Sequence, residues 1–286
     1  MTEAGGCLNQ KKLLKAVIMV FVAVSLCFNA FAEPVAKVKD ITPRFKRYIA
    51  DRYKHNTDTV GWLYVPGTNI NDVVVQNPPN NNEYYLKHDF FGRPDRDGIF
   101  AADRRCGLIR GGQLSRNTTI YGHTWTEDPD GDLFHQLIRF KDPHFAKDNP
   151  YIFFSTENED MAWEIFAVYY TTVDLPYIIP DLSWERFANV IQVAFASSIY
   201  HYGTKITSKD KILTLSTCTY DIPGVGRLNH NVPNRYRFVI KAKLIDGESA
   251  RKEKAFFTIN ENPMHVHSQP RIIRDDPEYR KMMGIA

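Results

Sequence analysis

Cysteine is scarce in this chain of 286 residues, which contains only four. Two of them, Cys7 and Cys27, lie in the first 33 residues, so Cys106 and Cys218 are the two left for a folded domain. An extracellular domain held together by disulfides usually has more. The count therefore excludes a disulfide scaffold. Three alternatives stay open for Cys218: a single disulfide bridge to Cys106, a packing role as a small hydrophobic residue, or a reactive thiol.

A strong charge of either sign is also absent. The net charge is +3, and residues 1–32 contribute +2 of it through three lysines and one glutamate, so the remainder carries +1. Electrostatic binding of nucleic acid or anionic lipid requires a marked positive excess, and the sequence predicts no nucleic-acid partner. Internal repeats and low-complexity runs are missing as well. With 43% hydrophobic residues, most of the chain can bury a core.

The N-terminal 33 residues are predicted to be a targeting segment. Three lysines precede an apolar run at residues 16–32, a pattern that keeps the N-terminus in the cytoplasm and directs the rest outward. The triplet Ala30–Ala32 fits a signal-peptide cleavage site. The run of 17 residues is also long enough for an uncleaved membrane anchor. Both alternatives place residues 34–286 outside the cytoplasm.

Residues 34–55 are predicted to form an N-terminal helix. Five apolar residues recur there at spacings of three and four: Val38, Ile41, Phe45, Tyr48 and Ile49. This spacing gives one apolar stripe. Thr42 followed by Pro43 is typical of a cap and a first helical position.

From Val60 onward the hydrophobic pattern is that of β-strands. Eight segments are separated by polar, Pro- and Gly-containing breaks: two within 60–76, then 98–103, 117–123, 151–156, 162–172, 211–218 and 235–245. This predicts a β-barrel or sandwich. Helices are expected after Asp132 and over 183–203, the second with Ser183 as N-cap. Residues 250–286 lack periodicity, which predicts a mostly solvated tail.

Cys218 ends the strand in "KILTLSTCTYD" and is a candidate nucleophile. A thiol attacks as thiolate, so it needs a proton acceptor or cation nearby, and donors where negative charge develops. His123 ends another β-rich run, and Arg235 and Arg237 open the last strand. Taken alone, His123 is typical of a structural histidine at a strand end, and each arginine is typical of a solvated charge at a sheet edge. Since Arg235 and Arg237 are two apart, alternation places both on one face and does not choose between them.

The remaining polar clusters indicate no metal. His265 and His267 lie in the tail without further ligands nearby in sequence. The acidic stretch Glu127–Asp132 has Gly131 at the wrong offset for an EF-hand, and no glutamate closes the loop. A loop with Asp132 capping a helix is predicted instead.

Several motifs resemble the sortases, the cysteine transpeptidases of bacterial surfaces. "TLSTC" is followed by an Arg-aromatic-Val-Ile strand, and "YGH" stands well upstream. "NTDTVGWLYVPGTNINDVVVQ", "NNEYYLKHDFFG", "GIFAADRR" and "NTTIYGHTW" resemble class B sortases in order, over about residues 56–245. The resemblance implies a mainly β fold. It consists of an eight-stranded sortase-type barrel over 56–246, an N-terminal helix, an inserted helix between strands six and seven, and a C-terminal tail over 247–286.

The resemblance also implies site residues. It places His123, Cys218 and Arg237 at the catalytic positions, with Arg237 chosen because a hydrophobic-Val-hydrophobic strand follows it directly. Ser216 and Thr217 match positions that line the substrate groove. The chain departs from the family in a longer loop between Cys218 and Arg237. Its first acid after the cysteine is Asp221, which is given no catalytic role.

The implied function is that of a cysteine transpeptidase without a cofactor. It cleaves an Asn-Pro-x-Thr-type sorting motif near the C-terminus of exported surface proteins, after Thr, through a thioacyl intermediate. The acyl group then passes to an amine of a cell-wall precursor or a pilin. The family favours a single-pass membrane anchor with the catalytic domain on the extracellular face.

Two alternatives stay open. One is another exported Cys/His peptidase, although L,D-transpeptidases have His-Gly directly before the nucleophile, and papain-like enzymes have the cysteine first, at a helix start. The other is a non-catalytic β-barrel binding module in which Cys218 is a core residue.

Overall fold

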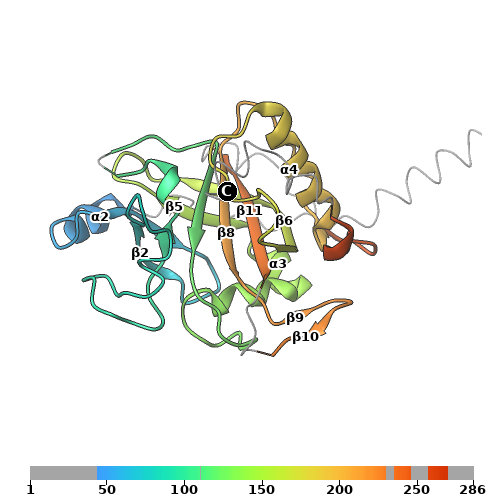
Figure 1. Cartoon of the computed structure of the whole chain (residues 1–286). Helices are drawn as coiled ribbons and strands as arrows, with labels where there is room; N and C mark the ends of the chain where they lie inside the picture. Colours follow the sequence, from blue (N-terminus) through green and yellow to red (C-terminus); the bar gives the residue numbers. More distant parts are fainter. Residues whose placement is uncertain (1–43, 110, 230–234, 246–256, 270–286) are drawn as a thin grey trace, which may run out of the picture.

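Eight strands close into a barrel in the computed structural model, which describes residues 44–109, 111–229, 235–245 and 257–269 (Figure 1). The order around the barrel is β1-β2-β3-β4-β8-β11-β6-β5. The strands are β1 (Thr59–Tyr64), β2 (Asn71–Gln76), β3 (Ala101–Ala102), β4 (Asn117–Tyr121), β5 (Tyr151–Ser155), β6 (Ala162–Thr172), β8 (Ile212–Cys218) and β11 (Tyr236–Ile245). The predicted mainly β, eight-stranded barrel is confirmed.

The pairing of β4, β8 and β11 decides which residues meet at the barrel rim. β4 runs parallel to β8, so both strands end at the same rim. β11 runs antiparallel to β8 and begins there, with Arg237 opposite Cys218. The ends of β4 and β8 and the start of β11 therefore lie at the same barrel rim.

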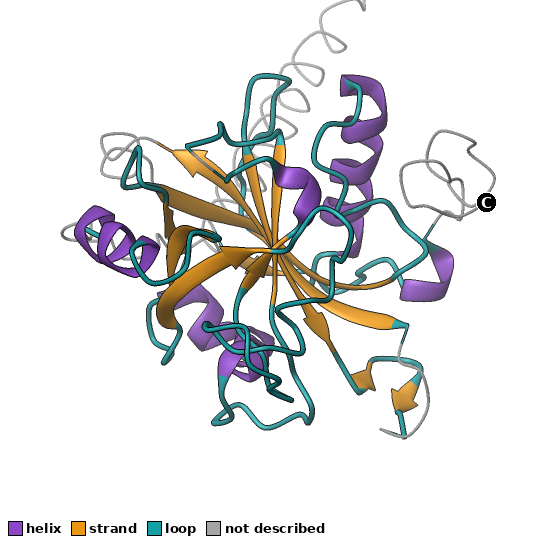
Figure 2. Ribbon diagram, turned by 60° about the vertical axis from the view of Figure 1, so that its left-hand side comes forward, coloured by secondary structure: helices purple, strands orange, loops and turns teal. Residues whose placement is uncertain are grey.

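Helix α4 (Trp184–Ser197) follows β6 and precedes β8, which confirms the inserted helix between the sixth and seventh barrel strands. It buries Phe187, Val190, Ile191 and Ala194 in an apolar layer that also contains Val239 of β11. The helix lies alongside the barrel in Figure 2. It is shorter than the predicted 183–203, because residues 200–201 form strand β7 (Tyr200–His201).

Helix α2 (Lys46–Tyr53) confirms the predicted N-terminal helix over its described part. Ile49 is buried, and the ring of Phe45 stacks on Trp62 of β1 with centroids 5.9 Å apart. Within the described residues this helix begins after Phe45, and residues 44–45 are not helical. Residues 1–43, including the apolar run and the Thr42 cap, lie outside the described residues. In the described part of the chain, no helix is long and apolar enough to cross a membrane.

The segment after Asp132 is a 3-10 helix, η2 (Leu133–Lys141), and not an α-helix. Its buried Phe134, Leu137 and Phe140 are spaced by three residues, which aligns them on one face at three residues per turn. Asp132 holds the N-cap position without a side-chain hydrogen bond. Helix α3 (Pro143–Asp148) follows, capped by the side chain of Asp142.

The predicted solvated tail includes a docked part, residues 257–269, in which Phe257, Val266 and Gln269 are buried while the other residues are exposed or half-buried. Strand β12 (Thr258–Ile259) pairs with β7, and Phe257 packs on the rings of Tyr200 and Tyr202. Gln269 is 5% exposed and donates to the Tyr170 carbonyl and the Ser197 hydroxyl. Single side chains and a two-residue strand hold this segment, so its sequence has no periodicity.

Candidate active site

Cys218 is the last residue of β8 and is half-buried, with a free thiol. Leu213 and Leu215 point into the barrel core, so alternation places Thr214, Ser216 and Cys218 on the outer face. Cys106 is also free and is fully buried, and burial raises the pKa of its thiol to about 12. The Cys106–Cys218 bridge that the sequence left open does not form.

The register of β11 separates the two candidate arginines. Arg237 lies directly opposite Cys218, is half-buried, and donates from Nη1 to the Tyr236 carbonyl at 2.9 Å. Arg235 precedes the strand, and its exposed guanidinium forms an ion pair with Asp174. The alternation of side chains along a strand could not distinguish Arg235 from Arg237. The distinction depends on where the β8–β11 ladder begins, which is at Arg237.

His123 lies two residues beyond the end of β4, on the loop that leaves the barrel rim. Its Nε2 lies 2.7 Å from the Leu86 carbonyl, which can only accept, so Nε2 carries a proton and Nδ1 is the atom that can exchange one. The ring stacks on Trp125 with centroids 4.2 Å apart. Burial lowers the pKa of His123, and the positive charges of Lys87 and Arg237 act in the same direction.

The residue before Cys218 is bonded to both neighbours of His123. Thr217 Oγ1 donates to the Gly122 carbonyl at 2.8 Å, and it lies 2.8 Å from Thr124 Oγ1. The charge of Arg237 acts on His123 as well. The structure therefore brings the cysteine, histidine and arginine predicted from the sequence to one rim of the barrel.

Ser216 and Thr217, predicted to line the substrate groove, are each 2% exposed. Ser216 Oγ lies 3.0 Å from the hydroxyl of Tyr177, which belongs to the segment between β6 and α4. Thr217 faces the opposite side of the strand from Cys218 and makes the loop contacts described above. Contact of either residue with substrate stays a prediction.

Three contacts around the site were not predicted from the sequence. They are the Leu86 carbonyl, the Trp125 ring, and the carboxylate of Glu127, which accepts from the Thr219 hydroxyl and from the amides of Tyr220 and Asp221. The acid four residues after His123 was the one visible signal, and it was interpreted only as part of a loop. Among the described residues, no group of three or more His, Cys, Asp or Glu side chains lies close enough to hold a metal ion.

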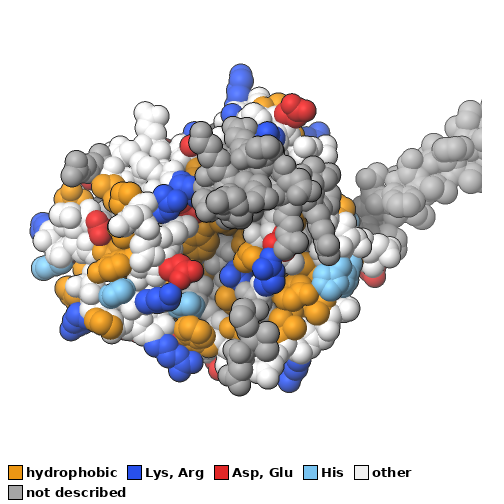
Figure 3. Space-filling model, viewed as in Figure 1, with side chains coloured by type: hydrophobic (Ala, Val, Ile, Leu, Met, Phe, Trp, Pro, Cys, Tyr) orange, Lys and Arg blue, Asp and Glu red, His pale blue; other side chains and the backbone are white. Residues whose placement is uncertain are grey.

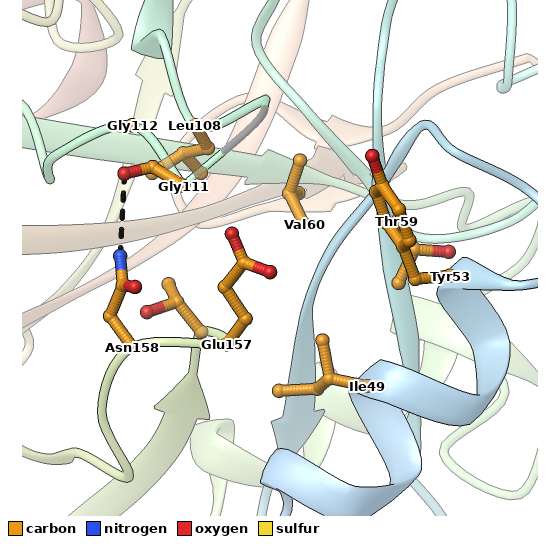
Figure 4. Close-up of a pocket in the computed structure, with 10 residues that line it drawn as sticks. Ile49, Tyr53, Thr59, Val60, Leu108, Gly111, Gly112, Glu157 and Asn158 are labelled. Atoms are coloured by element: carbon orange, nitrogen blue, oxygen red, sulfur yellow. Dashed lines mark hydrogen bonds between the residues drawn. The ribbon is translucent and has the colours of Figure 1, made fainter.

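Two hollows bordered by described residues lie next to helix α2. A cavity of about 10 Å³ between α2 and the barrel is lined by Ile49, Tyr53, Thr59 and Glu157 among others, and Asn158 donates there to the Gly111 carbonyl (Figure 4). A larger hollow of about 590 Å³ lies beside it, and Tyr53 borders both. Neither contains His123, Cys218 or Arg237. On the face shown in Figure 3, basic and acidic side chains are interspersed.

Comparison with known proteins gives one consistent family. No family model matches the chain. Sortase B of Listeria monocytogenes serovar 1/2a is 32% identical over 185 residues, which are 64% of this chain and 72% of the relative. The Staphylococcus aureus sortase B–substrate complex superposes with a TM-score of 0.59 at 26% identity, covering 73% of this chain and 88% of that one. Clostridium perfringens sortase B gives a TM-score of 0.58 at 29% identity, with 69% and 99% covered.

Proposed function

The chain belongs to the class B sortases, a family of cysteine transpeptidases, and we propose that it cuts a C-terminal sorting motif from exported proteins and transfers the acyl part to an amine. One observation carries this proposal: Cys218 lies opposite Arg237 at the rim where its neighbour Thr217 is bonded to both neighbours of His123. Staphylococcus aureus sortase B has been solved with its substrate, which supports a sorting-signal substrate as the donor. We take the motif to be of the Asn-Pro-x-Thr type.

In the first half-reaction, the Cys218 thiolate attacks the carbonyl carbon of the motif's Thr. A carbon–sulfur bond forms, and the carbonyl oxygen becomes an oxyanion that Arg237 and backbone amides near Cys218 stabilise. His123 then donates its Nδ1 proton to the nitrogen of the next residue, and the carbon–nitrogen bond breaks. The products are a thioacyl enzyme and a released peptide with a free amine.

In the second half-reaction, an acceptor amine attacks the thioacyl carbon. His123, now neutral, takes a proton from that amine as the new carbon–nitrogen bond forms, and the carbon–sulfur bond breaks to return the thiolate. The product is an amide, so the reaction is a transfer. Attack by water instead gives hydrolysis as a side reaction.

The proposal also includes the amine that accepts the acyl group and the side of the membrane on which the enzyme acts. We take the amine to belong to a cell-wall precursor or a pilin lysine, and residues 16–32 to be an uncleaved single-pass anchor. The catalytic domain then lies on the extracellular face, where nascent exported substrates appear. N-terminal sequencing of the protein from the membrane tests the anchor, and a mature chain that begins at Glu33 would refute it.

Incubation with a panel of sorting-motif peptides and an amine tests the chemistry, with products identified by mass spectrometry. Cys218→Ala should abolish both cleavage and transfer. Cys106→Ala is the matched control, because that thiol is buried within the barrel and should leave the reaction intact. Cleavage that persists in Cys218→Ala would contradict the mechanism. Cleavage by wild type without any amide product would show that the enzyme is a peptidase and not a transpeptidase.

A further inference from the structure

The carboxylate of Glu127 joins the two loops that carry the proposed nucleophile and acid. Glu127 lies on the loop after His123, and its Oε1 accepts from Thr219 Oγ1 at 2.9 Å, Tyr220 N at 2.5 Å and Asp221 N at 3.1 Å. We propose that Glu127 is a positioning residue that fixes the three residues after Cys218 against the His123 loop. The inference deepens the proposed function and rests on it.

The strand ladder explains why such a support is needed. β8 ends at Cys218, whose register partner on β11 is Arg237, and the described β8–β11 ladder stops at this pair. The next described strand pairing is the short hairpin of β9 (Asp221–Ile222) and β10 (Gly226–Arg227), next to which the Tyr220 carbonyl accepts from the Leu228 amide. The amides of Tyr220 and Asp221 therefore leave the barrel ladder, and the carboxylate of Glu127 takes the place of a neighbouring strand. A support at this point limits fraying of the strand end that presents the thiol.

Burial and charge suit Glu127 to this role. Its side chain is 18% exposed and forms an ion pair with Lys141, whose side chain is 25% exposed. The Lys141 ammonium also lies 5.4 Å from the ring centroids of Tyr170 and Phe238, which holds it in place. Burial alone would raise the pKa of Glu127, but the Lys141 and backbone hydrogen bonds outweigh it and lower the pKa. An ionised carboxylate can only accept, which matches the three donors at Oε1 and the Lys141 ammonium at Oε2.

A second contact shows that the two loops are joined at more than one point. Thr217, before the nucleophile, is bonded to Gly122 and Thr124, and residues 219–221, after it, are bonded to Glu127. Cys218 is therefore held on both sides by the segment that contains His123. The distance between the Cys218 thiol and the His123 ring is then set by these loop-to-loop contacts, and the two loops do not move independently.

The test compares four forms of the full chain: wild type, Glu127→Ala, Glu127→Gln and Asp130→Ala. Glutamine keeps a carbonyl oxygen that can accept from the amides. Asp130 is the matched control, because its ion pair with Arg139 joins the same loop to η2 without contact to residues 219–221. The double variant Glu127→Ala/Lys141→Met covers the case in which an unpaired Lys141 prevents folding.

Two measurements are made on each form. Hydrogen exchange by mass spectrometry follows the peptide that contains Tyr220 and Asp221. Steady-state kinetics with the best sorting peptide separate kcat from KM. Glu127→Ala should speed exchange and lower kcat by about tenfold or more, with KM changed by less than about threefold. Glutamine should restore most of both, and Asp130→Ala should change neither.

Unchanged exchange at Tyr220 and Asp221 in Glu127→Ala would overturn the inference, as would an equal loss of kcat in Asp130→Ala. If wild type turns over no sorting peptide, the proposed function has failed while the exchange comparison still decides the loop contact. The rate at which a small alkylating agent modifies Cys218 then replaces kcat. An unchanged rate in Glu127→Ala would contradict a positioning role.

Discussion

The outer faces of β8 and β11 carry a row of polar side chains whose two ends behave differently. At one end, Lys241 and Thr214 are fully buried, and Lys241 Nζ donates to Thr214 Oγ1 at 2.6 Å and to the Tyr177 carbonyl at 3.0 Å. At the other end, Cys218 and Arg237 are only half-buried. Both ends belong to the same two strands in the same register.

The difference lies in what covers the row. The segment between β6 and α4 lies over the buried end, where its Tyr177 and Ile179 carbonyls also accept from Asn117. Ser216, in the middle, still reaches the Tyr177 hydroxyl. The ladder stops at Cys218. Polar side chains on this face are therefore structural where the segment between β6 and α4 buries them and they hydrogen-bond to it. They are accessible for chemistry where that segment and the strand ladder both end.

Removing the arginine at the open end should have the largest effect. Arg237→Ala should lower kcat by about 10²–10³-fold if the guanidinium stabilises the oxyanion, with little change in the unfolding midpoint. Arg235→Ala is the matched control, because its exposed ion pair with Asp174 should matter little for activity. Kinetics on a sorting peptide measure both, and equal losses would remove the basis for choosing Arg237.

A change at the buried end should affect stability and not catalysis. Burial lowers the pKa of Lys241 to about 7, below the usual lysine value of about 10.4 in an unfolded chain. Between these two values the unfolded state binds the extra proton, so the free energy of unfolding rises with pH. The slope approaches about 1.4 kcal/mol per pH unit. Lys241→Met should remove this slope.

Denaturant titrations at pH 7, 8 and 9 measure the effect of Lys241→Met. The stability of the variant relative to wild type should fall as the pH rises, because only wild type gains. Lys243→Met, on the same strand and paired with Asp210, should keep the wild-type slope. A slope unchanged in Lys241→Met would show that Lys241 is charged in the folded protein.

Ser216, in the middle of the row, sharpens the comparison. Ser216→Ala removes the hydrogen bond with Tyr177 and should cost about 1 kcal/mol of unfolding free energy. If Ser216 only supports the covering segment, KM for the sorting peptide should stay within about twofold. A several-fold rise in KM without loss of stability would place Ser216 in the substrate groove instead.

The smallest expected effect concerns His123. Trp125→Ala removes the stacked ring and exposes the imidazole, so the lowered pKa of His123 should rise toward about 6.5, the ordinary value for histidine. Titration of the His123 ring signals by NMR measures the shift. Phe91→Ala serves as the control, because that ring is 61% exposed. No movement in Trp125→Ala would show that other groups bury the ring.

The strands and the helix over 183–203 were predictable, because strand and helix periods differ and each long segment shows one of them. The pattern left a barrel and a sandwich open, and the family resemblance chose the barrel. The choice of Arg237 came from family resemblance, since alternation treats Arg235 and Arg237 alike. The structure distinguishes them by where the ladder starts. Glu127, Trp125 and the Leu86 carbonyl could not be predicted, because loop side chains and backbone groups leave no periodic pattern. The 257–269 segment was missed for the same reason.

The docked segment 257–269 has a practical consequence for recombinant work. A fragment that ends with β11, at Ile245, contains all eight barrel strands and the three proposed catalytic residues. It would nevertheless uncover the rings of Tyr200 and Tyr202 where Phe257 packs, and would leave β7 without its partner. Exposed aromatic surface of this kind promotes aggregation. A soluble fragment for assays or crystallisation should therefore extend at least through Gln269.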